Sequence, residues 1–226
     1  MGQIAMVSRS RGLRHALGCG LAAAWFSLAV LHAQAATVTA VVTDEAGKPL
    51  ADAVVTIAPA AGTPMPPPAS QPDTATIDQS NETFVPSVVT IRTGGSVIFQ
   101  NGDAIRHHVY SFAPIRPFEL LQNPGERSQP VVFDKPGSAA IGCNIHDHMT
   151  AYVHVTDAPW AKVTDPAGKA VLTGIGAGHY VATVWHPRLR PKAAVPNKDI
   201  ALENTDSKLT VVLAVLPPRR PAPRDY

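Results

Sequence analysis

The chain has 226 residues, of which 45% are hydrophobic and 16% are charged, so it is long enough for one large domain or two small ones. Its formal net charge is only +2. Many of its basic residues gather toward the end of the chain, at Arg188, Arg190, Lys192, Arg219, Arg220 and Arg224. This balance gives no support for nucleic-acid binding.

The segment 1–35 is typical of a signal peptide. Arg9, Arg11 and Arg14 lie in a start without acidic residues, and the apolar run 16–31 follows, before small residues that suit cleavage near Ala35. The run is short and contains two glycines, which favours a cleaved signal over a retained membrane anchor. We therefore expect a periplasmic or otherwise exported protein, without stable membrane insertion once the signal is removed.

Removal of this segment changes both the charge and the cysteine content. Its three arginines leave 16 of the 19 basic residues against 17 acidic ones, a net charge of −1. Cys19 leaves with it, so Cys143 is the one remaining thiol and cannot form an internal disulfide. Unpaired thiols are unusual in an oxidising compartment, which favours a metal ligand over the alternative of an inert buried thiol.

The rest of the chain predicts an all-β fold, because short β-branched runs alternate with glycine and proline and no long segment has helical periodicity. The predicted strands are Thr37–Thr43, Ala53–Ile57, Ser87–Arg92, Ser96–Gln100, His108–Phe112, Gln129–Phe133, Ser138–Cys143, Ala151–Val155, Val171–Thr173, His179–Trp185 and Lys208–Leu213. A short helical turn is expected only at Phe118–Gln122. The proline-rich segment 61–73 is predicted to be a linker, and 217–226 a disordered tail.

A thiol, two imidazoles and a thioether lie within the seven residues from Cys143 to Met149, and a further imidazole pair, His107-His108, lies upstream. Two histidines and one cysteine in a plane, with a weak axial methionine, suit copper that alternates between Cu(I) and Cu(II). Strand alternation turns neighbouring side chains to opposite faces, so one of His107 and His108 completes the site. We favour His107, and His108 is the alternative.

Residues 74–156 resemble the cupredoxins, the small blue copper proteins. The resemblance covers 84–86, 89–91 and 95–101, then Phe133, Pro136 and Gly137 before the cysteine strand. The Cys-x-x-His-x-x-Met spacing is most similar to amicyanin, the cupredoxin type of methylamine utilisation, whose ligand loop is shorter than that of plastocyanin. The resemblance implies a Greek-key β-sandwich with one type 1 copper ion. The implied ligands are His107, Cys143, His146 and Met149.

Two features differ from that pattern. His108 stands where cupredoxins usually have an asparagine that holds the two ligand segments together, and Asp147 and His148 make the rim of the ligand loop polar. A polar rim changes the choice of partner. The remaining histidines are expected to be packed or solvated, with a second copper site as the alternative; they are His148, His154, His179 and His186.

The two flanks, 37–60 and 158–216, resemble the two halves of one carboxypeptidase-regulatory-like, transthyretin-type β-sandwich. The first half has Asp44, 47–50 and Ala53, and the second has Gly168 and 178–185. Each half alone has too few strands to close a core. We therefore expect one discontinuous sandwich with the cupredoxin, 74–156, inserted in a loop. Two unrelated flanking pieces are the alternative.

These observations predict an exported electron carrier that exchanges one electron with a redox partner protein. No open histidine-rich site for catalysis is visible in the sequence, so we expect no enzymatic activity. The alternative is a binding module that carries copper or tethers a partner without a dedicated redox role, because fold alone does not determine function.

Overall fold

A computed structural model describes residues 35–67, 72–191 and 195–218. These residues form 16 β-strands and no helix, which confirms the predicted all-β fold. Nearly all of the predicted signal peptide, most of the predicted tail and the middle of the predicted linker lie outside the described residues. Among the residues that are described, none belongs to a helix long and apolar enough to span a bilayer.

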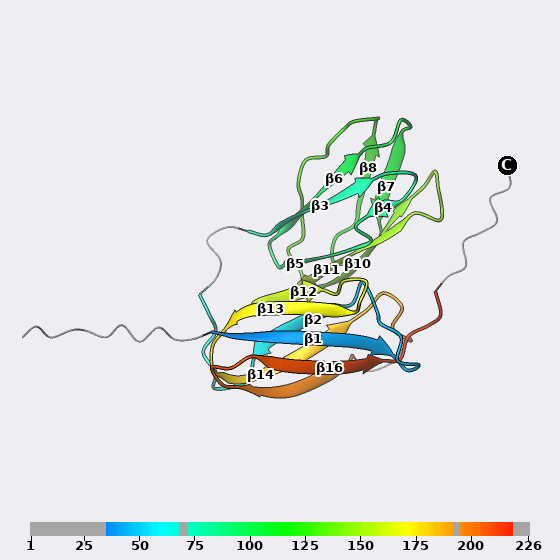
Figure 1. Cartoon of the computed structure of the whole chain (residues 1–226). Coiled ribbons are helices and arrows are strands. Elements are labelled where there is room, and N and C mark those ends of the chain that lie inside the picture. Colours follow the sequence, from blue (N-terminus) through cyan, green and yellow to red (C-terminus); the bar gives the residue numbers. More distant parts are fainter. Residues whose placement is uncertain (1–34, 68–71, 192–194, 219–226) are drawn as a thin grey trace, which may run out of the picture. The chain divides into compact units, whose positions relative to one another are not determined.

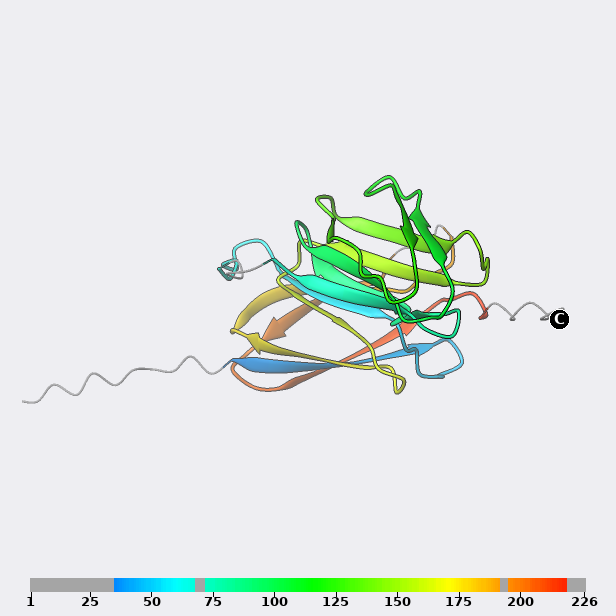
Figure 2. The same cartoon turned by 90° about the horizontal axis from the view of Figure 1, so that it is seen from above.

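Seven strands from the two flanks form one β-sandwich, here called the flanking sandwich. They are β1 (Ala36–Asp44), β2 (Val54–Pro59), β12 (Trp160–Val163), β13 (Lys169–Ile175), β14 (Gly178–Trp185), β15 (Asn197–Leu202) and β16 (Ser207–Leu213). One sheet has the order β13-β1-β16 and the other β12-β2-β14-β15. β1 lies beside β16 in both views, blue against orange-red, and pairs with it in parallel (Figure 1, Figure 2).

The other nine strands form a second β-sandwich, here called the central sandwich. They are β3 (Thr74–Gln79), β4 (Phe84–Val85), β5 (Val88–Arg92), β6 (Ser96–Asn101), β7 (His107–Ser111), β8 (Phe118–Gln122), β9 (Val131–Val132), β10 (Gly137–Cys143) and β11 (Thr150–Thr156). Its sheets have the orders β4-β3-β6-β9 and β5-β11-β10-β7-β8. The chain enters it after β2 and leaves it before β12, so the central sandwich is inserted in the flanking one.

Each sandwich has its own hydrophobic core because its strands alternate apolar and polar side chains. In β1 every second residue from Ala36 to Val42 is buried, and these side chains pack against β2 and β14. The core of the central sandwich is built around Phe84, Phe99 and Phe133. The boundaries of the domains as folding units, and the resemblance of the flanks to a carboxypeptidase-regulatory-like module, stay predictions.

The prediction of a helical turn at Phe118–Gln122 is wrong. This segment is β8, and it pairs antiparallel with β7 over its whole length, from His107 opposite Gln122 to Ser111 opposite Phe118. Its five residues alternate in exposure and end in a buried glutamine, which five residues of sequence do not distinguish from a helical turn. β3, β12 and β15 were also not predicted, whereas β4 falls within 84–86, which the cupredoxin resemblance covers. The strand predicted at 129–133 is shorter, as β9.

Candidate metal centre

The ladder between β7 and β10 brings the upstream histidine to the cysteine. Cys143, the last residue of β10, pairs with Val109 of β7, and the amide of Asn144 continues the ladder by donating to the His108 carbonyl at 3.0 Å. The following loop closes when the Met149 amide donates to the His146 carbonyl at 3.0 Å, and β11 begins one residue later. The loop is therefore fixed at both ends by backbone hydrogen bonds.

Three side chains meet inside this frame. One ligand atom each from His107, Cys143 and His146 lies within 4.8 Å of the others, and His107 Nδ1 is 3.6 Å from Cys143 Sγ. His107 is fully buried and Cys143 is 2% exposed. Metal–nitrogen bonds of about 2.0 Å and metal–sulfur bonds of about 2.3 Å at a trigonal angle would separate nitrogen and sulfur by roughly 3.7 Å. The observed spacing therefore suits a metal between them.

His146 shows an unsatisfied atom at the same place. Its Nδ1 is buried and has no hydrogen-bond partner, and its ring lies 5.3 Å from the His107 ring, between centroids. A buried polar atom without a partner is costly in a folded protein. The donor set of two imidazoles and one thiolate, with one nitrogen left free, fits a soft or borderline metal ion.

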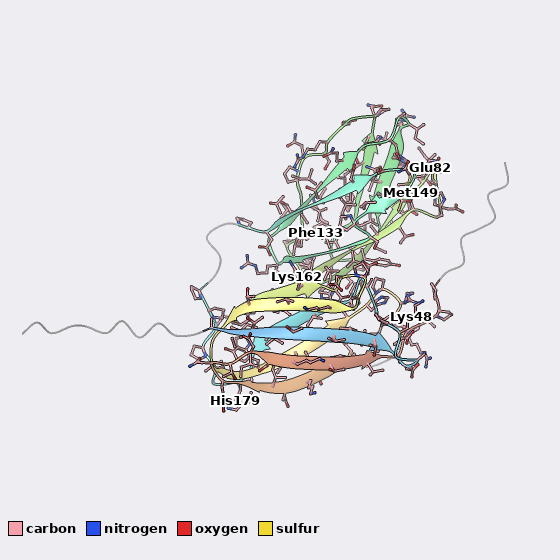
Figure 3. All side chains as sticks on the ribbon, in the orientation of Figure 1. Lys48, Glu82, Phe133, Met149, Lys162 and His179 are labelled. Carbon is pink, nitrogen blue, oxygen red and sulfur yellow. The ribbon has the colours of Figure 1, made fainter. Side chains whose placement is uncertain are left out.

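Met149 is 2% exposed and belongs to the same hydrophobic cluster as Cys143. Figure 3 shows Met149 and Glu82 at the same end of the central sandwich, where Glu82 Oε1 lies 4.0 Å from His146 Nε2. Met149 is thus a buried core residue at the end of the loop that begins after Cys143.

His108 points away from this group. Strand alternation buries His107 and leaves the His108 side chain 23% exposed, with its Nε2 3.2 Å from Glu119 Oε2 of β8. The three-residue group contains His107 and not His108.

Asp103 is a site residue that the sequence reasoning missed. Its Oδ2 lies 2.9 Å from His107 Nε2, the ring nitrogen opposite Cys143. Burial alone would raise the pKa of the Asp103 carboxyl, but hydrogen bonds from the Glu82 amide, the His107 ring and the Asn81 amide hold that pKa below its usual range. The one sequence signal was the spacing of four residues between Asp103 and His107.

The other histidines have separate surroundings. His148 Nε2 lies 3.1 Å from the Glu82 carbonyl, His154 Nδ1 is 2.9 Å from Ser138 Oγ, and His186 Nε2 is 3.1 Å from the Ala51 carbonyl. His179 is exposed. Within the described residues, His107, Cys143 and His146 are the one group of three or more such side chains that could hold a metal.

Comparisons with known proteins give partial matches. No family model matches this chain, and no curated protein sequence matches it either. Among solved structures, a Cu-containing nitrite reductase (NirK) from Thermus scotoductus SA-01 has 27% identity and a TM-score of 0.35, covering 41% of this chain and 24% of its own. A purple cupredoxin from Nitrosopumilus maritimus has 23% identity and a TM-score of 0.33, and the match covers 36% of this chain and 99% of the cupredoxin. Amicyanin from Paracoccus versutus has 20% identity and a TM-score of 0.33, and the match covers 45% of this chain and 96% of amicyanin.

Proposed function

We propose that this chain is an exported copper protein that holds one type 1 copper ion and transfers single electrons. The observation that carries the proposal is the buried group of His107, Cys143 and His146, in which a nitrogen and a sulfur lie 3.6 Å apart and His146 Nδ1 has no partner. His107 and His146 would supply Nδ1, Cys143 its thiolate and Met149 a weak thioether ligand. Bound copper would supply a one-electron couple between Cu(I) and Cu(II).

The protein contributes to this function by holding the ligand side chains rigidly and by excluding water from the site. β7 and β10 fix His107 and Cys143, the hydrogen bond from the Met149 amide to His146 closes the loop, and the core around Phe99 and Phe133 excludes water. Ligands held in this way cannot rearrange fully to suit either oxidation state. That constraint favours electron transfer over simple carriage of copper, which needs no such fixed frame.

Exposure indicates where the electron enters and leaves. The His107 side chain is fully buried, whereas the His146 side chain is 19% exposed and carries Glu82 at its outer edge. We therefore expect the electron to pass between the site and a redox partner protein through the exposed edge of His146. The surrounding Asp147 and His148 are exposed and make this rim polar.

The test is to load the purified protein with Cu(II) and record its visible spectrum. We expect an intense band from charge transfer between the Cys143 thiolate and copper, and a reversible one-electron wave in voltammetry. Cys143→Ser should lose the band. His107→Ala should lose it as well, whereas His108→Ala, the matched control on the other face of β7, should keep it.

Two results would contradict the proposal in different ways. A fully loaded, folded protein without the thiolate band has no type 1 site. A band without a reversible wave would support copper carriage instead of electron transfer.

A further inference from the structure

A single hairpin turn lies beside the outer nitrogen of the proposed ligand His146 and reaches that of His107 through Asp103. The turn joins β3 to β4, and Ser80 and Thr83 exchange hydrogen bonds of 2.9 and 3.2 Å across it. Asn81 and Glu82 both have positive φ, 53° and 55°, which turns their amides in the same direction. The Glu82 carboxylate lies 4.0 Å from His146 Nε2, and the Glu82 carbonyl lies 3.1 Å from His148 Nε2.

The amides of this turn hold the Asp103 carboxylate against His107. Asn81 N donates to Oδ1 at 2.6 Å and Glu82 N donates to Oδ2 at 3.0 Å. The Asp103 amide in turn donates to the side chain of Asn101 at 3.0 Å, and Asn101 is fully buried. Asp103 is thus fixed on three sides, and its Oδ2 reaches His107 Nε2 at 2.9 Å.

We propose that Asp103 is a positioning residue that fixes the tautomer of His107 and lowers the reduction potential of the copper site; this inference rests on the proposed function. The carboxylate accepts a hydrogen bond from the Nε2 proton of His107, so the proton stays on Nε2 and the lone pair of Nδ1 faces Cys143. Because only 13% of the Asp103 side chain is exposed and His107 is buried, water screens this negative charge poorly. The charge makes the imidazole a stronger donor and stabilises Cu(II), the more highly charged state.

The chain offers a matched control for this interaction. Glu119 faces His108 at 3.2 Å, so it forms the same kind of carboxylate–histidine pair on the adjacent residue, but outside the ligand group. Asp103→Asn and Glu119→Gln each remove one charge with almost no change in size. A general effect of charge would shift the reduction potential of both variants, whereas the proposed role of Asp103 predicts a shift only in Asp103→Asn.

The first measurement is the reduction potential of the copper-loaded variants. At a given applied potential, Asp103→Asn should raise the ratio of Cu(I) to Cu(II) at least about tenfold over the wild type. For one electron this corresponds to a rise of about 59 mV in the reduction potential. Glu119→Gln should change the ratio by less than about twofold. Equal potentials in Asp103→Asn and Glu119→Gln would overturn the inference while leaving the copper function intact.

The second measurement uses metal-free protein, so it does not depend on copper function. Nitrogen–proton NMR correlation of the imidazoles at about pH 8, above the usual histidine pKa, should show His107 with its proton on Nε2. In Asp103→Asn that preference should weaken. A wild-type His107 with its proton on Nδ1 would overturn the inference even if the variant failed to fold, whereas a copper-loaded protein without the thiolate band would overturn the proposed function alone.

Discussion

Asn101 joins the loop after β6, which contains Asp103, to the last residue of β8. Its buried amide donates to the carbonyls of Ile105 and Gln122 at 2.8 and 3.1 Å, and its Oδ1 accepts from the Asp103 amide. Asn101→Ala leaves these three backbone groups without their partner, so we expect a loss of about 2–4 kcal/mol in the free energy of unfolding. Denaturant unfolding measures this loss.

Asn123→Ala is the matched control. The Asn123 side chain bonds only to the exposed Glu126 carboxylate, at 3.2 Å, and its removal should cost less than about 0.5 kcal/mol. Similar losses in the two variants would mean that the buried bonds of Asn101 contribute no more than a surface contact.

The candidate ligands were accessible to sequence reasoning because their chemistry is local. Cys143, His146 and Met149 lie within one short loop, and alternation along a strand separates His107 from His108. Asp103 and Glu82 were not accessible. Their place depends on the turn at 80–83 meeting the loop at 102–106, and no periodicity in either segment indicates that contact.

A buried pair of glutamines ties together three strands of the central sandwich. Gln79 Nε2 of β3 donates to Gln122 Oε1 of β8 at 2.7 Å, and Gln122 Nε2 donates to the Phe99 carbonyl of β6 at 2.9 Å. Each single replacement by leucine leaves a buried polar partner unsatisfied, so Gln79→Leu and Gln122→Leu should each cost about 1–3 kcal/mol.

The double variant tests whether the pair acts as a unit. Because it removes both members of the contact, its cost should be smaller than the sum of the single costs by at least about 0.5 kcal/mol. Additive costs in a double-mutant cycle of unfolding free energies would mean that the two side chains do not depend on each other.

The strands that the sequence predicted are those with strong apolar alternation, such as β1 and β10. The strands that it missed lack that signal. β3 and β15 are rich in polar residues, with the sequences TATIDQ and NKDIAL, and β15 also lies at the edge of its sheet. Pairing with β6 and β14 makes them strands. These segments are strands because they pair with segments distant in sequence, and local β-propensity carries no information about that pairing.

The joining of the two flanks into one sandwich places a strict demand on Gly168. It has φ +70°, and a Cβ there would overlap the Val42 carbonyl oxygen and lie 3.1 Å from Leu50 N. Both are backbone atoms, already joined by a hydrogen bond of 3.0 Å. We therefore expect Gly168→Ala to lower the free energy of unfolding by more than about 2 kcal/mol.

Gly174 separates the two causes of that loss. It has a similar φ of +79°, but nothing lies within 4 Å of its Cβ position. Gly174→Ala should therefore show only the backbone strain, about 1 kcal/mol. Thermal or denaturant unfolding measures both variants, and equal losses would exclude the backbone contact between the flanks as the cause.

The stability of the whole molecule should depend on pH through His154. Its ring stacks on Trp185 at 4.9 Å between centroids and bonds to Ser138, and burial lowers its pKa from 6.5 to about 4. Between these two values the unfolded chain binds a proton that the folded protein does not. The contribution of His154 to the free energy of unfolding is therefore greatest above about pH 6.5. It falls by roughly 3 kcal/mol as the pH drops to about 4.

His154→Gln removes this titration while keeping a polar side chain opposite Ser138. The variant should lose less stability than the wild type between about pH 6.5 and 4, because only the wild type has a histidine whose unfolded form takes up the proton. Burial also lowers the pKa of His186, with Arg188 adding to the effect, so the variant retains part of the slope. Denaturant unfolding across this range compares the slopes, and identical slopes would show that the neutral His154 ring does not limit stability in acid.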